Sequence, residues 1–218
     1  SQITSLKPFK KAYTIIYDLI NNLKNLGHNI KHVDLGGGLG VPYSDDESIP
    51  TFTEYANLIQ SIFGNTNLKV YIEPGRLLLA NSGLLITKVI DVKTTSQKTF
   101  VIVDAAMNDF IRPSLYNSYH EILPIKNNLG TSNKLYDIVG PICETGDYFA
   151  KNRRMNSVKP GSLIAIKSVV AYGSVLSSNY NSRPQIAELL VKDNEYAIVR
   201  DRIEVKDLLK QEKIAHWL

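Results

Sequence analysis

Hydrophobic residues recur at helical spacing twice in the first third of the chain. Residues 7–26 carry apolar side chains every three to four positions, and Gly27 supplies a stop signal. Residues 51–63 repeat this pattern, with Thr51 or Thr53 as the expected N-terminal cap. The sequence therefore predicts two amphipathic helices in this region.

Two short apolar runs follow these helices, at residues 30–35 and 68–74. Each ends at glycine or proline, as buried strands commonly do. Helix and strand in alternation are typical of parallel strands joined by crossover helices. Two helix–strand units fall far short of the eight in a (β/α)8 barrel, so we expect a piece of such a fold.

After about residue 84 the pattern changes to short β-rich runs separated by turn residues, which predicts an antiparallel sheet or sandwich. The expected strands lie in residues 83–95, 98–105, 134–142, 162–170, 187–193 and 195–201, and residues 202–213 predict a closing helix. The fold class is thus α/β plus all-β, with a first domain at residues 1–84 and a second at residues 85–218.

Composition narrows the functional classes. With 44% hydrophobic and 21% charged residues among 218, the chain is typical of a soluble globular protein. No apolar run approaches the roughly 20 residues needed to cross a bilayer, and the first residues lack the pattern of a signal peptide. The single cysteine, Cys143, excludes an internal disulfide and favours a reducing compartment, so we expect a cytoplasmic protein. The net charge of +4 is scattered, which disfavours nucleic-acid binding and suits small anionic ligands.

The segment DLGGGLG, residues 34–40, places Gly36, Gly37 and Gly38 directly after an expected strand. Such a turn can close backbone N–H groups around a phosphate, but a tight turn also needs glycines for positive φ without any ligand. A dinucleotide-binding fingerprint does not fit, because a loop with Pro42 intervenes where a helix should begin. The motif alone leaves both interpretations open.

The segment EPGR, residues 73–76, ends the next expected strand. Because adjacent parallel strands end at the same rim, Glu73 and Arg76 should lie near the glycine turn. Glu73 could hold a charged heterocyclic nitrogen, and Arg76 suits a phosphate or a carboxylate. A surface ion pair beside a proline turn is the alternative.

Further candidate side chains lie in the second part. Arg112 and Tyr116 share one face if residues 111–120 contain a helical turn, which an ordinary amphipathic turn would also explain. Tyr172 precedes Gly173 in the polar segment AYGSVLSSNYNSRP, where a tyrosine can either pack or bind.

The segment GPICETGD, residues 140–147, sets Cys143 beside Glu144 in an expected loop. The thiol is either an acid–base group or inert filler. No metal is expected, because the histidines show no metal-ligand spacing: His28, His32, His120 and His216.

Taken in order, SQI, DLGGGLG, YIEPGR, VDAAMNDFIRPSLYNSYH, GPICETGD and AYGSVLSSNYNSRP closely resemble the diaminopimelate decarboxylases. That family belongs to the pyridoxal 5'-phosphate (PLP) enzymes with an alanine-racemase-like barrel. The resemblance spans the whole chain. It implies the C-terminal part of a PLP-binding (β/α)8 barrel followed by an antiparallel β-sandwich or barrel domain, and it makes the phosphate at the glycine turn that of PLP.

The resemblance also implies roles for individual residues. Glu73 would face the pyridine nitrogen and keep it protonated, which strengthens the ring as an electron sink. Cys143 would donate the proton to the decarboxylated carbon, from a loop that enters the site of the partner subunit in a homodimer. The residues expected to bind the cofactor are Ser1, Gly36, Gly37, Gly38, Glu73, Gly75, Arg76 and Tyr172, and those expected to bind the substrate are Arg76, Arg112, Tyr116, Glu144 and Tyr172. Two arginines and an acid suit a molecule with an amino-acid group at each end.

Two departures from the family pattern stand out. The Schiff-base lysine and the ring-stacking histidine of the family lie upstream of the segment SQI, so this chain alone is expected not to bind PLP covalently and to be inactive. Before Tyr172 the family usually has Asp-Ala-Gly-Ala, where this chain has Ser168, Val169, Val170 and Ala171. The valines could crowd the strand below the cofactor.

The sequence thus predicts decarboxylation of meso-2,6-diaminopimelate to L-lysine and CO2, the last step of lysine biosynthesis, with diaminopimelate as the small-molecule substrate. A related decarboxylase for arginine, ornithine or a polyamine precursor is the enzyme alternative, and those relatives usually have aspartate in place of Glu144. A non-catalytic β-domain interaction fragment is the alternative from another class.

Overall fold

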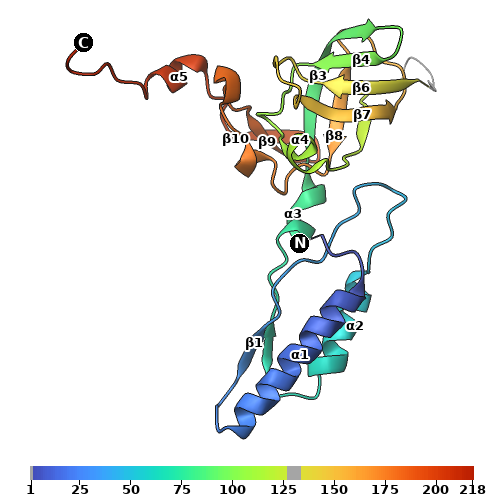
Figure 1. The fold of residues 1–218 in the computed structure, drawn as a ribbon, viewed down its shortest axis with the longest axis vertical. Coiled ribbons are helices and arrows are strands. Elements are labelled where there is room, and N and C mark those ends of the chain that lie inside the picture. Colours follow the sequence, from blue (N-terminus) through green and yellow to red (C-terminus); the bar gives the residue numbers. More distant parts are fainter. Residues whose placement is uncertain (1, 127–133) are drawn as a thin grey trace. The chain divides into compact units, whose positions relative to one another are not determined.

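The computed structural model describes residues 2–126 and 134–218. The chain divides into two compact units, Ser1–Gly83 and Leu84–Leu218 (Figure 1). Each unit has its own hydrophobic core.

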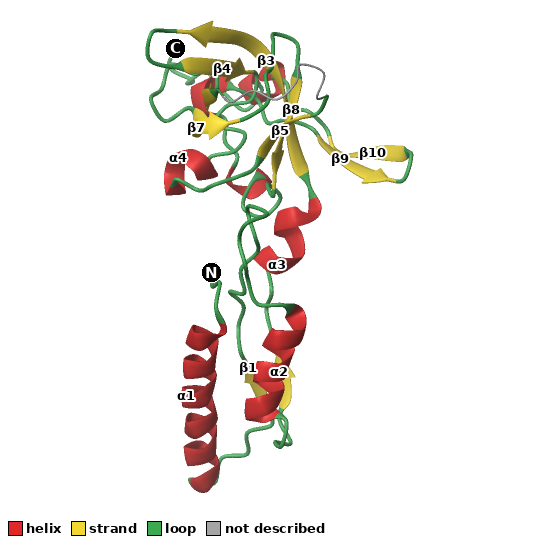
Figure 2. Cartoon of the chain, turned by 90° about the vertical axis from the view of Figure 1, so that its right-hand side faces the viewer, coloured by secondary structure: helices red, strands yellow, loops and turns green. Residues whose placement is uncertain are grey.

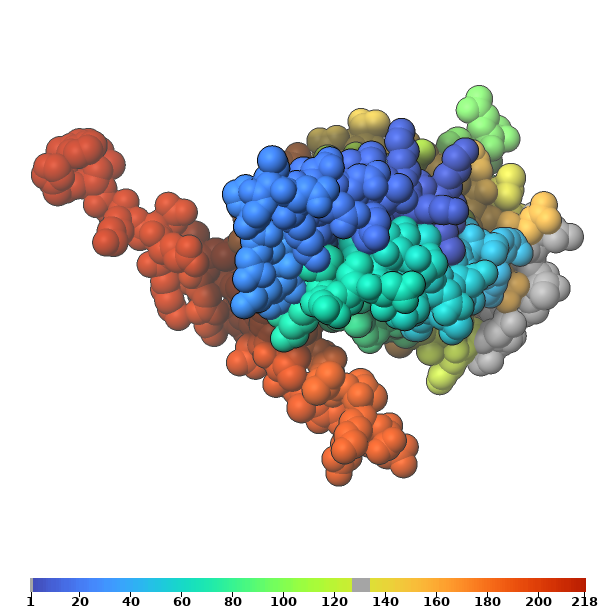
Figure 3. All heavy atoms as spheres, turned by 90° about the horizontal axis from the view of Figure 1, so that it is seen from below, coloured from blue at the N-terminus to red at the C-terminus, as the bar shows by residue number. Residues whose placement is uncertain are grey.

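The first unit is an α/β arrangement. Its elements are α1 (Leu6–Asn25), β1 (His32–Asp34), α2 (Phe52–Phe63), β2 (Lys69–Tyr71), α3 (Arg76–Leu79) and the 3-10 turn η1 (Ala80–Ser82). Strands β1 and β2 pair in parallel, so the prediction of parallel strands with crossover helices is confirmed. Helices α1 and α2 lie side by side (Figures 1 and 3).

Local sequence explains both long helices. In α1 the buried side chains of Phe9, Tyr13 and Ile20 recur at helical spacing, and Gly27 follows at φ +89°, a backbone angle that suits glycine. Helix α2 begins at a capping box in which the Thr51 hydroxyl accepts from the Glu54 N–H and the Glu54 carboxylate accepts from the Thr51 N–H. Thr51 is therefore the cap.

Aromatic rings join the two helices into one core. Phe9 and Tyr13 of α1 pack against Tyr55 and Phe63 of α2, with ring centroids 5.2–6.4 Å apart. The hydroxyls of Tyr13 and Tyr55 form a buried hydrogen bond of 2.6 Å. Val33 of β1 belongs to the same core and Val70 of β2 packs against it, so the helices pack against the β1–β2 pair.

The second unit is built on a sheet of six strands in the order β5-β8-β3-β4-β6-β7 (Figures 1 and 2). These strands are β3 (Leu84–Thr94), β4 (Thr99–Val103), β5 (Ile122–Pro124), β6 (Leu135–Val139), β7 (Tyr148–Arg154) and β8 (Leu163–Lys167). A separate hairpin joins β9 (Glu188–Lys192) to β10 (Glu195–Arg200), and short helices lie at α4 (Arg112–Tyr116), η2 (Ser174–Leu176), η3 (Tyr180–Ser182) and α5 (Val205–Leu209).

Strand β3 pairs with two different strands along its length. Its residues 84–88 pair with β8, and its residues 89–94 pair with β4. A register shift between Val89 and Asp91 lies at the start of the half that pairs with β4, and such bulges bend a strand. The bend lets the sheet curl around buried aliphatic side chains such as Val101, Ile138 and Ile164.

The prediction of a wholly antiparallel sheet is wrong at one place, because β4 and β6 pair in parallel. A long connection that includes α4 and β5 carries the chain back to start β6 in the direction of β4. Strands β5 and β7 were not expected from the sequence. The closing helix is shorter than expected, since α5 covers only Val205–Leu209.

Among the described residues, no helix is both long and apolar enough to cross a membrane. No group of three or more potential metal ligands comes together in residues 2–126 and 134–218.

Candidate functional site

In the first unit, the ends of β1 and β2 meet at one corner. Val33 is paired with Val70 and Asp34 with Tyr71. Beyond the strands, the pairing continues through the N–H of Leu35, which donates to the Tyr71 carbonyl at 3.0 Å. The N–H of Glu73 then donates to the Gly36 carbonyl at 2.9 Å. The glycine turn and the EPGR segment therefore lie side by side, as the sequence predicts.

Gly37 makes the closest approach in this corner. A Cβ atom built at Gly37 would lie 2.1 Å from the Glu73 carbonyl oxygen, so no larger residue fits without displacing the backbone. Gly36 and Gly38 have φ values of +67° and +104°, where glycine is favoured. All three glycines are thus explained by the geometry of the turn itself. The Gly36 N–H donates to Asp34 Oδ1 at 2.8 Å, so the N–H groups of Gly37 and Gly38 are the candidate donors to an anion.

The N-terminal residues support the turn from its other side. The Ile3 N–H donates to the Gly38 carbonyl, and the Gly40 N–H donates to the Ile3 carbonyl, both at 3.0 Å. The Gln2 side-chain amide donates to the Val41 carbonyl at 2.6 Å and accepts from the Val41 N–H at 3.2 Å. Ser1, expected to contact the cofactor, lies outside the described residues.

Arg76 begins helix α3, with Gly75 as its N-terminal cap residue. Its Nη1 donates to the hydroxyl of Tyr43, and its guanidinium carbon lies 5.9 Å from the centre of the same ring. Tyr43 is 8% exposed and comes from the polar loop after the glycine turn. Sequence reasoning missed Tyr43, whose only signal is an aromatic residue within a polar loop. Glu73 is exposed in the same corner.

In the second unit, Arg112 and Tyr172 are neighbours. Arg112 is 6% exposed at the start of α4, so the helical turn assumed for residues 112–116 is present. Its guanidinium carbon lies 5.9 Å from the centre of the Tyr172 ring. Tyr116 ends the same short helix and is exposed. The structure thus brings two of the expected substrate-binding side chains together.

Tyr172 lies in a tight turn. Tyr172 has φ +63° and Ser168 has φ +60°, both unusual for residues other than glycine. A Cβ at Gly173 would lie 2.1 Å from the Val169 carbonyl oxygen. Val169 packs into the core of the second unit, whereas Val170 is 37% exposed. The unusual residues before Tyr172 are therefore accommodated in the turn.

Cys143 and Glu144 lie in an exposed loop between β6 and β7. Glu144 Oε1 accepts from the Gly146 N–H at 3.0 Å, and its Oε2 accepts a long hydrogen bond of 3.4 Å from the Tyr180 hydroxyl. The Ser114 hydroxyl of α4 donates to the Gly146 carbonyl. The loop is thus tied to α4, which carries Arg112.

Two buried carboxyl groups belong to this part of the second unit: Asp147 lies at the end of the loop, and Asp109 lies in the neighbouring loop at residues 105–109. Burial raises the pKa of Asp147, although the N–H groups of Ile142 and Met107 and the charge of Arg183 act in the opposite direction. Burial likewise raises the pKa of Asp109, against the effect of the Ala106 N–H. Neither carboxyl group was singled out from the sequence.

The first unit thus carries a glycine turn, an exposed carboxylate and an arginine on neighbouring segments. The second unit carries a buried arginine and an exposed Cys-Glu loop. A family model described as "Pyridoxal-dependent decarboxylase, C-terminal sheet domain" matches residues 14–169. The chain belongs to this family of pyridoxal-dependent decarboxylases.

Comparison with individual curated proteins supports the same family. The chain is 48% identical over 219 residues to the diaminopimelate decarboxylase of Zymomonas mobilis, covering 100% of this chain and 52% of that protein. It is 42% identical over 202 residues to the enzyme of Aquifex aeolicus, covering 93% of this chain and 48% of that protein. The chain spans about half the length of the curated relatives it matches.

Comparison with solved structures supports the same family. A diaminopimelate decarboxylase from M. jannaschii matches with a TM-score of 0.93 and 34% identity, over 100% of this chain and 51% of that one. The Helicobacter pylori diaminopimelate decarboxylase complexed with L-lysine matches with a TM-score of 0.89 and 39% identity, over 97% of this chain and 52% of that one.

Proposed function

We propose that this chain forms part of a PLP-dependent enzyme that decarboxylates meso-2,6-diaminopimelate to L-lysine and CO2, the last step of lysine biosynthesis. The observation that carries the proposal is the corner where Gly37 abuts the Glu73 backbone, because it brings a glycine turn next to the segment that holds the Glu73 carboxylate and the Arg76 guanidinium. Sequence identity of 42–48% to diaminopimelate decarboxylases over 93–100% of the chain supports the substrate.

The residues at this corner fit the proposed cofactor. The N–H groups of the glycine turn and the guanidinium of Arg76 suit a phosphate dianion, and the Glu73 carboxylate suits a protonated pyridine nitrogen. PLP, when bound, supplies an electron sink for the carbanion that remains after CO2 leaves. We also propose that Ser1, Gly75 and Tyr172 contact the cofactor.

The substrate would be held by its charged ends. A buried guanidinium such as that of Arg112 binds a carboxylate strongly, and the Tyr172 ring beside it limits its movement. Glu144 suits the ammonium group at the distal end of the substrate. Arg76, Tyr116 and Tyr172 complete this set. A buried arginine beside an aromatic ring, as Arg112 is, favours a substrate with a carboxylate at that position.

The proton that replaces CO2 would come from Cys143. The S–H group of a thiol can donate a proton to carbon. Exposure of Cys143 fits a loop that reaches into the site of a second subunit. We therefore propose a cytoplasmic homodimer with shared active sites.

We further propose that residues 1–84 are part of a (β/α)8 barrel that binds PLP, and that residues 85–218 form a β-sandwich or barrel domain with the substrate and dimer loops. The parallel β1–β2 pair, with helices packed behind it, supports the first part of this proposal. The curled six-stranded sheet supports the second.

The experiment is CO2 release by the full-length protein with PLP, from meso-diaminopimelate, arginine and ornithine in parallel. We expect turnover of diaminopimelate, with L-lysine as the product. Preferred turnover of arginine or ornithine would instead identify a related decarboxylase. Absence of CO2 release from all three substrates would favour a non-catalytic interaction module.

A further inference from the structure

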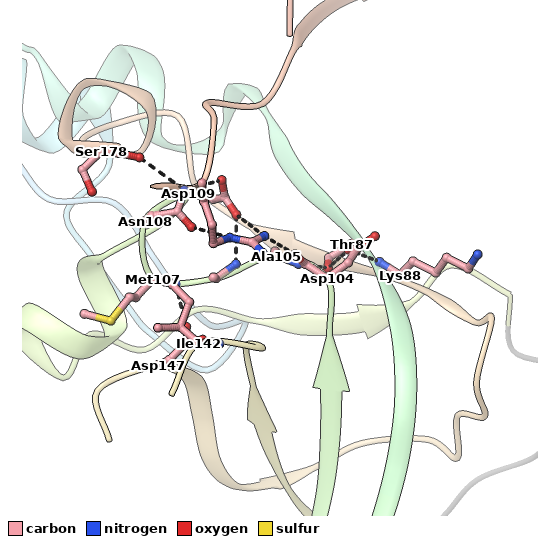
Figure 4. A network of polar contacts seen from close by, with 12 residues as sticks. Thr87, Lys88, Asp104, Ala105, Met107, Asn108, Asp109, Ile142, Asp147 and Ser178 are labelled. Carbon is pink, nitrogen blue, oxygen red and sulfur yellow. Dashed lines mark hydrogen bonds and ion pairs between the residues drawn. The ribbon is translucent and has the colours of Figure 1, made fainter. Parts of the chain in front are cut away.

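Asp147 is a buried carboxylate that the proposed reaction does not use. It is 4% exposed and closes the loop that begins at Gly140. Its Oδ2 accepts from the Ile142 N–H and its Oδ1 from the Met107 N–H, both at 2.7 Å (Figure 4). One carboxylate therefore joins the start of the Cys143 loop to a second loop, residues 105–109, of the same unit.

Backbone hydrogen bonds close the loop around this carboxylate. The Gly140 N–H donates to the Asp147 carbonyl, and the Asp147 N–H donates to the Glu144 carbonyl, both at 3.0 Å. A Cβ atom built at Gly140 would lie 2.3 Å from Asp147 Oδ2. The glycine at this position thus makes room for the carboxylate, so the two residues form one fitted arrangement.

The loop at residues 105–109 is itself held firmly. Asp109 Oδ2 accepts from the Ala106 N–H at 2.9 Å and lies 3.7 Å from the Arg183 guanidinium. Arg183 Nε donates to Asn108 Oδ1 at 2.9 Å. The Met107 N–H is therefore a fixed donor, and a carboxylate attached to it is held in place as well.

Only a carboxylate satisfies both donors at once. Each oxygen of Asp147 faces a backbone N–H, and an amide side chain would offer one acceptor and one donor in the same space. An N–H facing an NH2 group would lose its hydrogen bond in a buried position, which is costly. Asn at position 147 should therefore release one anchor of the loop.

We infer that Asp147 is a positioning residue that holds the loop bearing Cys143 and Glu144 in its working place through the amides of Ile142 and Met107. The inference rests on the proposed function for the roles of Cys143 and Glu144. The loop anchor itself stands on hydrogen bonds and burial and can be tested without any substrate.

The experiment compares Asp147→Asn and Gly140→Ala in the full-length protein loaded with PLP. Gly140→Ala pushes on the carboxylate and keeps its charge, so it stands in if Asp147→Asn fails to fold. Asp137→Asn is the matched control, because Asp137 is another buried aspartate that accepts a backbone N–H, from Asn152 at 2.7 Å, in the same unit. Three quantities are measured: amide hydrogen exchange at Ile142 and Met107, the alkylation rate of Cys143 by iodoacetamide, and kcat and KM for diaminopimelate.

Both loop variants should speed exchange of the Ile142 amide by about tenfold or more and change the alkylation rate of Cys143. They should also lower kcat and raise KM, because Cys143 and Glu144 move together. The control should leave exchange at Ile142 and Cys143 alkylation as in the native protein.

Unchanged exchange and alkylation in both loop variants would overturn the inference. So would a displaced loop with native kcat and KM, since the loop position would then not matter to the reaction. A native protein that releases no CO2 from diaminopimelate, but whose loop responds as expected, would refute the proposed function and support the anchor.

Discussion

Substitution of Gly37 by alanine probes the corner between the two strand ends. The new Cβ would lie 2.1 Å from the Glu73 carbonyl oxygen, whereas ordinary contact begins at 3.4 Å. The two backbones must therefore part by about 1 Å. The hydrogen bond of 2.9 Å from the Glu73 N–H to the Gly36 carbonyl would stretch beyond useful length. Overpacking costs about 1–3 kcal/mol and the lost hydrogen bond about 0.5–1.5 kcal/mol, so we expect a loss of about 2–4 kcal/mol in all.

The assay has two parts, both on the full-length protein. Urea unfolding of the PLP-free form reports the stability cost, and titration with PLP reports cofactor affinity. Gly75→Ala is the matched comparison for the first part, since Gly75 has φ −78° and its Cβ would meet no atom within 4 Å. We expect Gly37→Ala alone to lower the unfolding midpoint. If half of this cost is felt by the bound state, PLP binding should weaken by about 5- to 30-fold. Native stability and native PLP affinity in Gly37→Ala would refute the close approach.

Three further outcomes are expected. Arg112→Ala should lower kcat/KM for diaminopimelate, and the fall should correspond to about 2–5 kcal/mol of lost transition-state stabilisation because the guanidinium is buried. Turnover equal to that of the native enzyme would remove the role assigned to Arg112. Tyr43→Phe keeps the ring but removes the hydroxyl that accepts from Arg76, so PLP titration should show an affinity lower by about 1–2 kcal/mol; unchanged affinity would exclude the contact. Burial raises the pKa of Asp137, but the hydrogen bond and charge of Lys98 and the hydrogen bond from the Asn152 N–H outweigh burial, so the pKa is lowered overall. The ionised carboxylate therefore stabilises the fold above about pH 4, and this stability is lost as the pH falls further. Asp137→Asn should therefore flatten the acid-side fall of the urea midpoint, and an unchanged slope would contradict this assignment.

Much of the first unit could be predicted because its signals are local. The capping box at Thr51 and Glu54 lies within four residues, and the buried face of α1 follows from apolar spacing alone. The meeting of the glycine turn with EPGR follows from one rule of parallel strands, which the β1–β2 register confirms.

Strand partners in the second unit could not be predicted in the same way. The parallel pairing of β4 with β6 depends on a long connection, and no local pattern records it. Strand β7 was missed because it is interrupted: Asn152 has φ +50°, and polar residues from Lys151 to Arg154 hide the apolar pair Phe149 and Ala150. A β-rich pattern fixes the class of the sheet but not its pairing.

In the candidate site, too, some residues could be predicted from the sequence and others could not. Motif chemistry singled out Cys143 and Arg112, whose side chains carry the reactive groups. Tyr43 and Asp147 were missed because their contacts join loops far apart in sequence, and in the case of Asp147 the partners are backbone amides. Such roles depend on three-dimensional distances that no residue type reveals.

The central claim of the proposed function is a single PLP molecule bound where the glycine turn meets the EPGR segment. The direct measurement is a crystal structure of the full-length protein with PLP. We predict that the phosphate lies at the N–H groups of Gly37 and Gly38, with the ring nitrogen toward Glu73. A phosphate bound elsewhere, with this corner filled only by solvent, would contradict the account.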